Sequence, residues 1–245
     1  MASTTHSKPN SLGLKVAVFA DGANREDMIK RYRDGSVQGF TTNPTLMAKA
    51  GVKDYAAFAK SVLSEIKTLP ISFEVFSDEL NEMEREAMII SSWASNVNVK
   101  IPITNTQGKP TLALIRKLLD KNLKLNVTAL FTQEQLDALR EVLKPQDDVI
   151  VSIFAGRIAD TGVDPVPLMK KAVVDYRHLS GSKILWASPR EALNIYQADE
   201  CGCHIITATD DQIAKLKLRG KSLTEFSLET VKMFYADATK AGFTL

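Results

Sequence analysis

Residues 96–103 read Asn-Val-Asn-Val-Lys-Ile-Pro-Ile, a short run in which branched aliphatic residues alternate with polar ones. This alternation predicts a β-strand, because neighbouring side chains of a strand point to opposite faces. The aliphatic residues share one face, and Lys100 lies on the other. On the surface of an antiparallel sheet Lys100 would be an ordinary solvated residue, whereas in a closed parallel barrel it would point into the lumen, where lysines are rare. The pattern of this strand alone leaves both interpretations open.

Seven further runs rich in Val, Ile and Thr predict strands at 15–21, 39–43, 71–75, 124–130, 148–156, 183–188 and 204–209. Between them apolar residues recur three or four positions apart, as in Tyr55, Phe58, Val62 and Ile66, which is typical of amphipathic helices. Alternating strands and helices predict parallel pairing through right-handed crossovers. Eight such units in 245 residues favour a closed (β/α)8 barrel, which typically needs about 250.

The alternative is an open, doubly wound sheet that binds a nucleotide. Such a sheet usually carries a glycine-rich turn after its first strand. Here residues 20–27 read Ala-Asp-Gly-Ala-Asn-Arg-Glu-Asp, with a single glycine, and neither a dinucleotide fingerprint nor a P-loop motif occurs in the chain. The sequence therefore favours the barrel.

We expect one barrel domain over residues 13–245, preceded by a flexible polar tail of residues 1–12 and ending in an extra helix at about 222–240. The N-terminal stretch lacks the apolar core of a secretory signal, and the two cysteines cannot form a disulfide framework. A cytoplasmic protein fits best. The net charge of +2 gives no indication of nucleic acid or membrane binding, so we expect small molecules as partners.

The segment Cys201-Gly-Cys203-His204 raises the question of a metal site. A structural zinc needs a fourth ligand, and both His6 and His178 lie far away in the sequence. We therefore expect buried thiols, no metal ion and no cofactor.

Active sites of β/α barrels lie at the carboxyl ends of the strands. The polar residues at or near these predicted ends are Asp21, Thr41, Thr42, Asn43, Glu74, Lys100, Thr128, Ser152, Arg157, Ser188 and Arg190. A desolvated lysine favours the neutral amine that attacks a carbonyl, and carboxylates beside it can move the protons. Asp21 is equally well placed to cap a helix over residues 23–34.

These residues, with their neighbours, resemble the motifs of the transaldolase family, which includes the fructose-6-phosphate aldolases. The matching segments follow one another in the family's order over nearly the whole chain. They are Asp21, Gly39–Leu46, Val99–Thr104, Asn126–Phe131, Ser152–Ile158 and Ala187–Arg190.

The resemblance implies a class I mechanism without a cofactor, in which Lys100 forms a Schiff base with a ketose phosphate. It implies that Asp21 is the acid and base at the bond cleaved, and that Glu74 and Thr128 hold the catalytic water. It also implies substrate contacts, with Thr42, Asn43 and Ser152 near the dihydroxyacetone part and Arg157, Ser188 and Arg190 at the phosphate. Sugar phosphates of the pentose phosphate pathway and a homo-oligomeric assembly are the expected partners.

Two positions bear on the reaction type. Family members that release free dihydroxyacetone tend to carry Gln and Tyr where this chain has Glu74 and Phe154, so the resemblance favours transfer over simple cleavage. The chain departs from the family pattern at Trp186 and Pro189, next to the expected phosphate site. A sulfonated sugar or a seven- or eight-carbon sugar phosphate therefore remains an alternative substrate.

Overall fold

A computed structural model describes residues 13–244 of the chain, and the predicted tail with His6 lies outside these residues. The chain divides into two compact units, Met1–Ile213 and Ala214–Leu245. The first unit contains every strand found within residues 13–244, and the second contains the predicted C-terminal helix.

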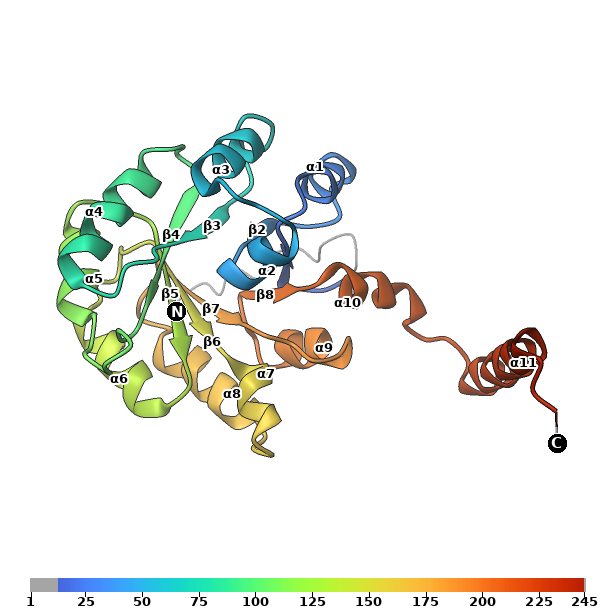
Figure 1. The fold of residues 1–245 in the computed structure, drawn as a ribbon. Helices are drawn as coiled ribbons and strands as arrows, with labels where there is room; N and C mark the ends of the chain where they lie inside the picture. The colour runs from blue at the N-terminus through green and yellow to red at the C-terminus, as the bar shows by residue number, and fades with distance from the viewer. Residues whose placement is uncertain (1–12, 245) are drawn as a thin grey trace. The chain divides into compact units, whose positions relative to one another are not determined.

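The first unit is a closed barrel of eight parallel strands in sequence order, in which β8 pairs with β1 (Figure 1). The strands are β1 Ala17–Asp21, β2 Gly39–Thr41, β3 Ile71–Glu74, β4 Val97–Pro102, β5 Leu125–Leu130, β6 Val149–Ile153, β7 Ser182–Trp186 and β8 Ile205–Ala208. All eight predicted strands are therefore confirmed, and most are shorter than the sequence pattern indicates. The fold is a (β/α)8 barrel.

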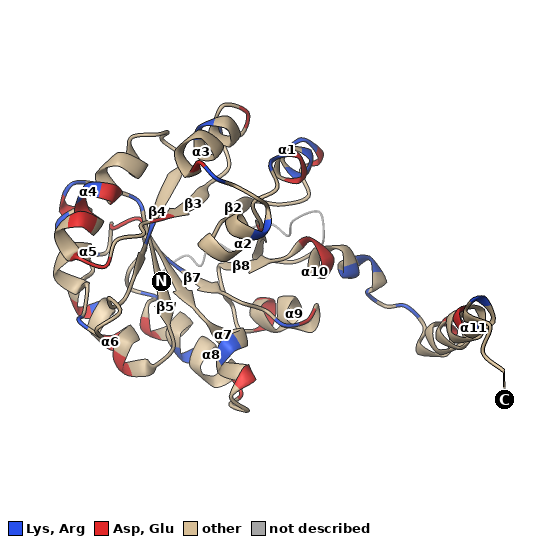
Figure 2. Ribbon diagram, in the orientation of Figure 1, with Lys and Arg blue, Asp and Glu red and all other residues tan. Residues whose placement is uncertain are grey.

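Helices surround the strands, as the aliphatic faces of the strands require (Figure 1). They are α1 Arg25–Asp34, α2 Pro44–Lys49, α3 Tyr55–Leu63, α4 Leu80–Ser91, α5 Leu112–Asp120, α6 Gln133–Val142, α7 Ala155–Asp160, α8 Val166–Asp175, α9 Leu193–Glu200 and α10 Asp210–Ala214. Charged residues are carried mainly by these helices (Figure 2). The expected helix after β1 begins later than predicted, because Asn24 rather than Asp21 caps it through the amides of Glu26 and Asp27.

The two faces of the strands have different compositions. Val99 and Ile101 of β4 are completely buried on the outer face, beneath the helices. The lumen instead holds a set of buried polar side chains: Thr41, Ser72, Asn98, Lys100, Asn126, Thr128, Ser152 and Thr207. Beside them, Phe19, Ile150, Leu185, Ala187 and Ile205 form an apolar cluster. The closed barrel thus places Lys100 in the lumen.

The second unit consists of a 3-10 helix, Lys215–Leu218, and the helix α11, Leu223–Ala241. Ser222 caps the start of α11, and Gly242 follows its end in the left-handed conformation. No residue of α11 is buried, and its large apolar residues are widely exposed. None of the helices within residues 13–244 has the length and apolar character needed to cross a membrane.

Cys201 and Cys203 are buried free thiols, as expected. Within residues 13–244 no group of three or more His, Cys, Asp or Glu side chains could hold a metal ion.

Candidate active site

A cavity of about 410 Å³ opens at the carboxyl ends of the strands. It brings together most of the residues singled out from the sequence: Asp21, Asn43, Glu74, Lys100, Thr128, Ser152, Phe154, Arg157 and Ser188. These residues come from β1, the β2–α2 turn, the strands β3 to β6, the start of α7 and the turn after β7. The arrangement agrees with the general position of active sites in this fold.

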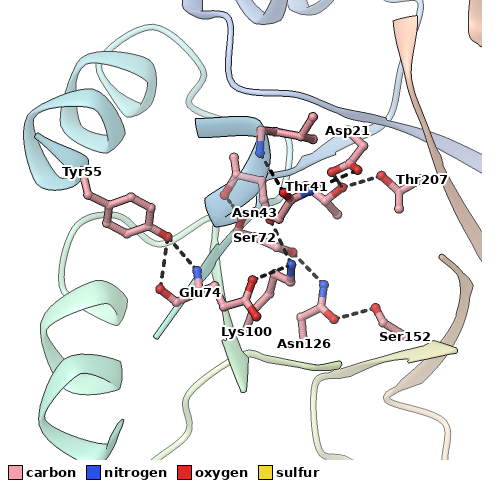
Figure 3. Close-up of polar contacts among 12 residues, drawn as sticks. Asp21, Thr41, Asn43, Tyr55, Ser72, Glu74, Lys100, Asn126, Ser152 and Thr207 are labelled. Atoms are coloured by element: carbon pink, nitrogen blue, oxygen red, sulfur yellow. Dashed lines mark hydrogen bonds and ion pairs between the residues drawn. The ribbon is translucent and has the colours of Figure 1, made fainter. Parts of the chain in front are cut away.

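Lys100 lies deep in this cavity, with only 7% of its surface exposed. Its Nζ donates hydrogen bonds to the carbonyl oxygen of Thr42 at 2.9 Å and to Oε2 of Glu74 at 3.0 Å (Figure 3). The register of β3 against β4 sets this contact, because Glu74 is paired directly with Lys100. The contact gives the amine a carboxylate with which to exchange protons, as attack of an amine on a carbonyl requires.

Asp21, at the end of β1, is the second carboxylate of the cavity. The hydroxyl of Thr41 donates to its Oδ1 at 2.7 Å, and Nδ2 of Asn43 lies 3.4 Å from its Oδ2. Burial raises the pKa of Asp21 above its usual value, and this effect outweighs the hydrogen bond from Thr41 and the attraction of Lys100. A carboxyl group with a raised pKa is suited to exchange protons with a substrate near neutral pH.

Thr128 presents a buried hydroxyl group that has no hydrogen-bond partner in the structure. The pairing of β5 with β6 shifts between Val127 and Leu130, and Ala129 has a positive φ of 61°. This irregularity lets both Thr128 and Ala129 line the cavity, whereas successive residues of a regular strand face opposite sides. A buried hydroxyl without a partner is a natural site for a water molecule or a substrate atom.

Asn126 links three strands in the lumen and was not assigned a role from the sequence. Its Nδ2 donates to Oγ of Ser72 at 3.0 Å, and its Oδ1 accepts from Oγ of Ser152 at 2.6 Å (Figure 3). Strand alternation could have identified it, because Asn126 is two residues before Thr128 on the same strand. Thr41 was likewise given no role from the sequence. It donates a hydrogen bond to Asp21 and is also hydrogen-bonded to Thr207.

Arg157 lies on the side of the cavity formed by the turns after β6 and β7. Its guanidinium lies over the ring of Phe154, 5.4 Å from the ring centre, which orients the charge. Ser188 faces the same space and has a positive φ of 60°. Its carbonyl oxygen lies so close to Gly156 that a Cβ atom there would be 1.5 Å away. The start of α7 and the turn after β7 can therefore approach each other only because residue 156 is glycine.

Two residues predicted from the sequence do not line the cavity. Thr42 contributes its backbone carbonyl to Lys100, while its hydroxyl donates to the carbonyl oxygen of Ser72. Arg190 forms a two-pronged ion pair with Asp160, and about half of its side chain is exposed. Its role at a phosphate therefore stays a prediction, and in this structure Arg157 is the guanidinium that faces the cavity.

Comparison with known proteins identifies the fold and the family of the chain. A solved structure from Burkholderia cenocepacia, named a lyase/mutase, matches 97% of the chain and 86% of its own with a TM-score of 0.60, but at 9% identity it shows the fold alone. Two proteins called "Probable transaldolase" are much more similar in sequence. The one from Dehalococcoides mccartyi is 35% identical, covering 78% of this chain and 86% of its own. The one from Bdellovibrio bacteriovorus is 34% identical, covering 91% and 97%. Residues 18–245 match the model of the family Transaldolase/Fructose-6-phosphate aldolase, and the chain therefore belongs to this family.

Proposed function

We propose that this protein is a transaldolase that moves a three-carbon dihydroxyacetone unit from a ketose phosphate, such as fructose 6-phosphate, to an aldose acceptor through a Schiff base on Lys100. The observation that carries the proposal is the position of Lys100, a buried lysine whose Nζ lies 3.0 Å from Glu74 inside a cavity that also contains Asp21 and Thr128. A structural lysine would not need two carboxylates and an unpartnered hydroxyl around it.

The first step is attack of the neutral Lys100 amine on the C2 carbonyl of the ketose, which forms a C–N bond and a carbinolamine. Loss of water then requires a proton for the departing hydroxyl and gives a protonated imine. Glu74 is within reach of the nitrogen, and the Thr128 hydroxyl is free to hold the water. These two residues are therefore assigned the proton transfers of imine formation and hydrolysis.

Cleavage of the C3–C4 bond requires removal of the proton from the C4 hydroxyl. Asp21 accepts this proton, an aldehyde leaves, and the electron pair of the broken bond is held as an enamine on Lys100. In the reverse direction the enamine attacks the acceptor aldehyde, and Asp21 returns the proton to the new hydroxyl. The raised pKa of Asp21 supports this exchange, because it brings the pKa closer to the pH at which the enzyme works.

Glu74 and Phe154 support transfer rather than release of free dihydroxyacetone, as the family resemblance implies. Phe154 lines the cavity, and its ring centre lies 5.5 Å from that of Phe131. This apolar wall offers no hydroxyl to protonate the enamine. A fructose-6-phosphate aldolase activity is the second candidate, and the amount of dihydroxyacetone released without an acceptor distinguishes the two.

Arg157 supports an anionic substrate. Its guanidinium lines the cavity, and a guanidinium can form paired hydrogen bonds to a phosphate, so we assign it to the phosphate of the sugar. Arg190 is paired with Asp160 and is not assigned to the phosphate here. A sulfonated sugar or a longer sugar phosphate therefore stays an alternative acceptor. Within this proposal Asn43 and Ser152 contact the hydroxyls of the dihydroxyacetone unit. The proposed setting is the pentose phosphate pathway in the cytoplasm, where the free thiols of Cys201 and Cys203 would persist.

The helix α11 supports a homo-oligomer. Its exposed large apolar residues are Leu223, Phe226, Leu228, Val231, Met233, Phe234 and Tyr235. At helical spacing they cover most of its circumference, while Glu225, Glu229, Lys232 and Lys240 share the remaining side. An apolar surface of this kind is normally covered by another protein surface, and we assign a second copy of this chain as its partner.

Trapping the covalent intermediate tests the proposed function. The protein is incubated with fructose 6-phosphate and sodium borohydride, which reduces the imine to a stable amine, and the adduct is mapped by peptide mass spectrometry. We expect one adduct on Lys100 and none in Lys100→Met. Absence of the adduct, or equal labelling of the variant, would overturn the Schiff-base mechanism on Lys100. Binding of the sugar phosphate without any adduct would favour the alternative, a barrel that only binds it.

A further inference from the structure

The strand β3 continues beyond its neighbour β2. Pairing between the two ends at Thr41 and Ser72, and the chain then turns at Asn43 into α2. On its other side β3 remains paired with β4 as far as Glu74. Glu74 is thus paired to a strand on one side only.

The backbone groups of Glu74 point to the side from which β2 has departed. Successive residues of a parallel strand direct their N–H and C=O groups to alternate neighbours. Val75 donates to the carbonyl oxygen of Lys100 on β4, whereas the carbonyl oxygen of Ser72 accepts from Thr42 on the β2 side. The N–H and C=O groups of Glu74, two residues after Ser72, therefore point to the β2 side like those of Ser72. No strand pairs with them there.

The phenol of Tyr55 occupies this position. The N–H of Glu74 donates to the Tyr55 oxygen at 2.7 Å, and the Tyr55 hydroxyl donates to the carbonyl oxygen of Glu74 at 3.2 Å (Figure 3). One hydroxyl group thus replaces both hydrogen bonds that a neighbouring strand would make. Burial raises the pKa of Tyr55 far above its usual value, which favours the protonated phenol that makes both contacts.

Aromatic residues hold the Tyr55 ring in place. Its centre lies 6.0 Å from that of Phe73, 4.4 Å from that of Phe76 and 5.8 Å from that of Trp93. Tyr55 is also the first residue of α3, whose start is fixed by the Asp54 side chain accepting from the amide of Ala57. The hydroxyl therefore has little freedom to move away from Glu74.

We propose that Tyr55 is a positioning residue for the reaction: its hydroxyl completes the end of β3 and thereby holds the Glu74 carboxylate against Lys100. This inference rests on the proposed function, because it assigns Tyr55 a kinetic effect exerted through Glu74. Tyr55 does not line the cavity and is not itself assigned contact with the substrate.

Tyr55→Phe removes the hydroxyl and keeps the ring. Tyr176→Phe is the control, because the Tyr176 hydroxyl likewise donates to a backbone carbonyl, that of Leu136, at 2.6 Å, although Tyr176 is buried and Tyr55 only partly so. We expect Tyr55→Phe to lower kcat roughly 10- to 100-fold, as small displacements of catalytic groups do, with KM changed less than about 3-fold. Tyr176→Phe should lose stability without losing kcat.

A double-mutant cycle separates positioning from a general structural effect. In the Glu74→Gln background, Tyr55→Phe should cause little further loss of kcat, because the carboxylate it positions is already gone. An equal loss in both backgrounds, or an unchanged kcat in Tyr55→Phe, would overturn the proposal. Borohydride trapping on wild-type Lys100 is run in parallel, so failure of the Schiff-base proposal is seen separately.

If Tyr55→Phe does not fold, Phe76→Leu provides the second variant. The side chain of Phe76 is 53% exposed and contacts the Tyr55 ring, so its replacement loosens the phenol with little effect on the core. We expect a smaller loss of kcat that also disappears in the Glu74→Gln background. A crystal structure of Phe76→Leu shows whether the Tyr55 hydroxyl has left Glu74. If it has left and the folded variant retains full kcat, the inference is contradicted.

Discussion

Glu74 and Lys100 are direct partners in the register of β3 and β4, and their side chains form an ion pair of 3.0 Å in the lumen. Both side chains are largely shielded from water, with exposed fractions of 19% and 9%. A buried pair of this kind is costly to break from one side, because the remaining charge loses its partner. The contact therefore links the stability of the barrel to its proposed chemistry.

Glu74→Gln keeps the shape of the side chain and removes its charge and proton acceptor. We expect kcat for transfer to fall by roughly 10²-fold or more, the usual effect of losing a general acid or base, with a smaller change in KM. Steady-state rates with fructose 6-phosphate and an aldose acceptor measure this. An unchanged kcat would remove Glu74 from the mechanism, while an increase in free dihydroxyacetone would link this residue to the choice between transfer and release.

Asp21→Asn should lower activity and raise stability at neutral pH. Burial holds the pKa of Asp21 in the folded protein above its ordinary value, so its contribution to stability is complete only at low pH and is lost as the pH rises through the raised pKa. Asparagine avoids this loss. Chemical denaturation at pH 7.5 and at pH 5 should show a gain in the free energy of unfolding that shrinks on acidification, and a variant less stable than wild type at pH 7.5 would contradict this.

Most of the barrel could be predicted from the sequence, because each strand is a short aliphatic run and each helix shows its own spacing. The strand ends could not. Residues 42 and 43 continue the β-like pattern of β2, but Asn43 caps α2 through the amide of Leu46, so the strand stops at Thr41. Of the two roles that the sequence left open for Asp21, it does not cap α1: Asn24 does, and Asp21 accepts a hydrogen bond from Thr41 on the neighbouring strand β2.

The candidate site could be predicted wherever a strand end carries a polar residue, as at Lys100, Glu74 and Thr128. Contacts that depend on how turns fold could not be anticipated. Arg190 is close in sequence to Ser188, yet it pairs with Asp160 at the end of α7. Tyr55 lies at the start of a helix whose spacing identifies it only as a core residue, and its contact with Glu74 emerges from the early end of β2.

Gly156→Ala should disrupt the cavity through the backbone. Its Cβ would lie 1.5 Å from the carbonyl oxygen of Ser188, and a backbone atom cannot move aside as a side chain does. We expect a loss of stability of roughly 1–3 kcal/mol or more from overpacking, with loss of activity as Ser188 shifts. Gly22→Ala is the control, because no atom lies within 4 Å of its added Cβ. Thermal unfolding and rates of both variants decide the matter, and a Gly156→Ala protein as stable and active as Gly22→Ala would refute the close approach.

Arg157→Gln should weaken the recognition of phosphorylated substrates. Removal of a charge-assisted contact should raise KM for fructose 6-phosphate roughly 10- to 100-fold and leave KM for non-phosphorylated acceptors nearly unchanged. Arg190→Gln is the informative comparison, because Arg190 is paired with Asp160 in this structure. A smaller effect at Arg190 is expected. Equal effects would mean that Arg190 leaves Asp160 to join Arg157 on the phosphate.

Val231→Glu should weaken assembly if α11 is covered by a second copy of the chain. Val231 is 59% exposed and belongs to the apolar part of the helix, so a charge there is placed on the surface that the proposed partner would cover. Lys232→Gln, on the charged side of the same helix, is the control. Light scattering should show an oligomer for wild type and Lys232→Gln and smaller species for Val231→Glu at equal concentration. A monomeric wild-type protein would reject the assembly, and identical masses for all three would place the interface elsewhere on the chain.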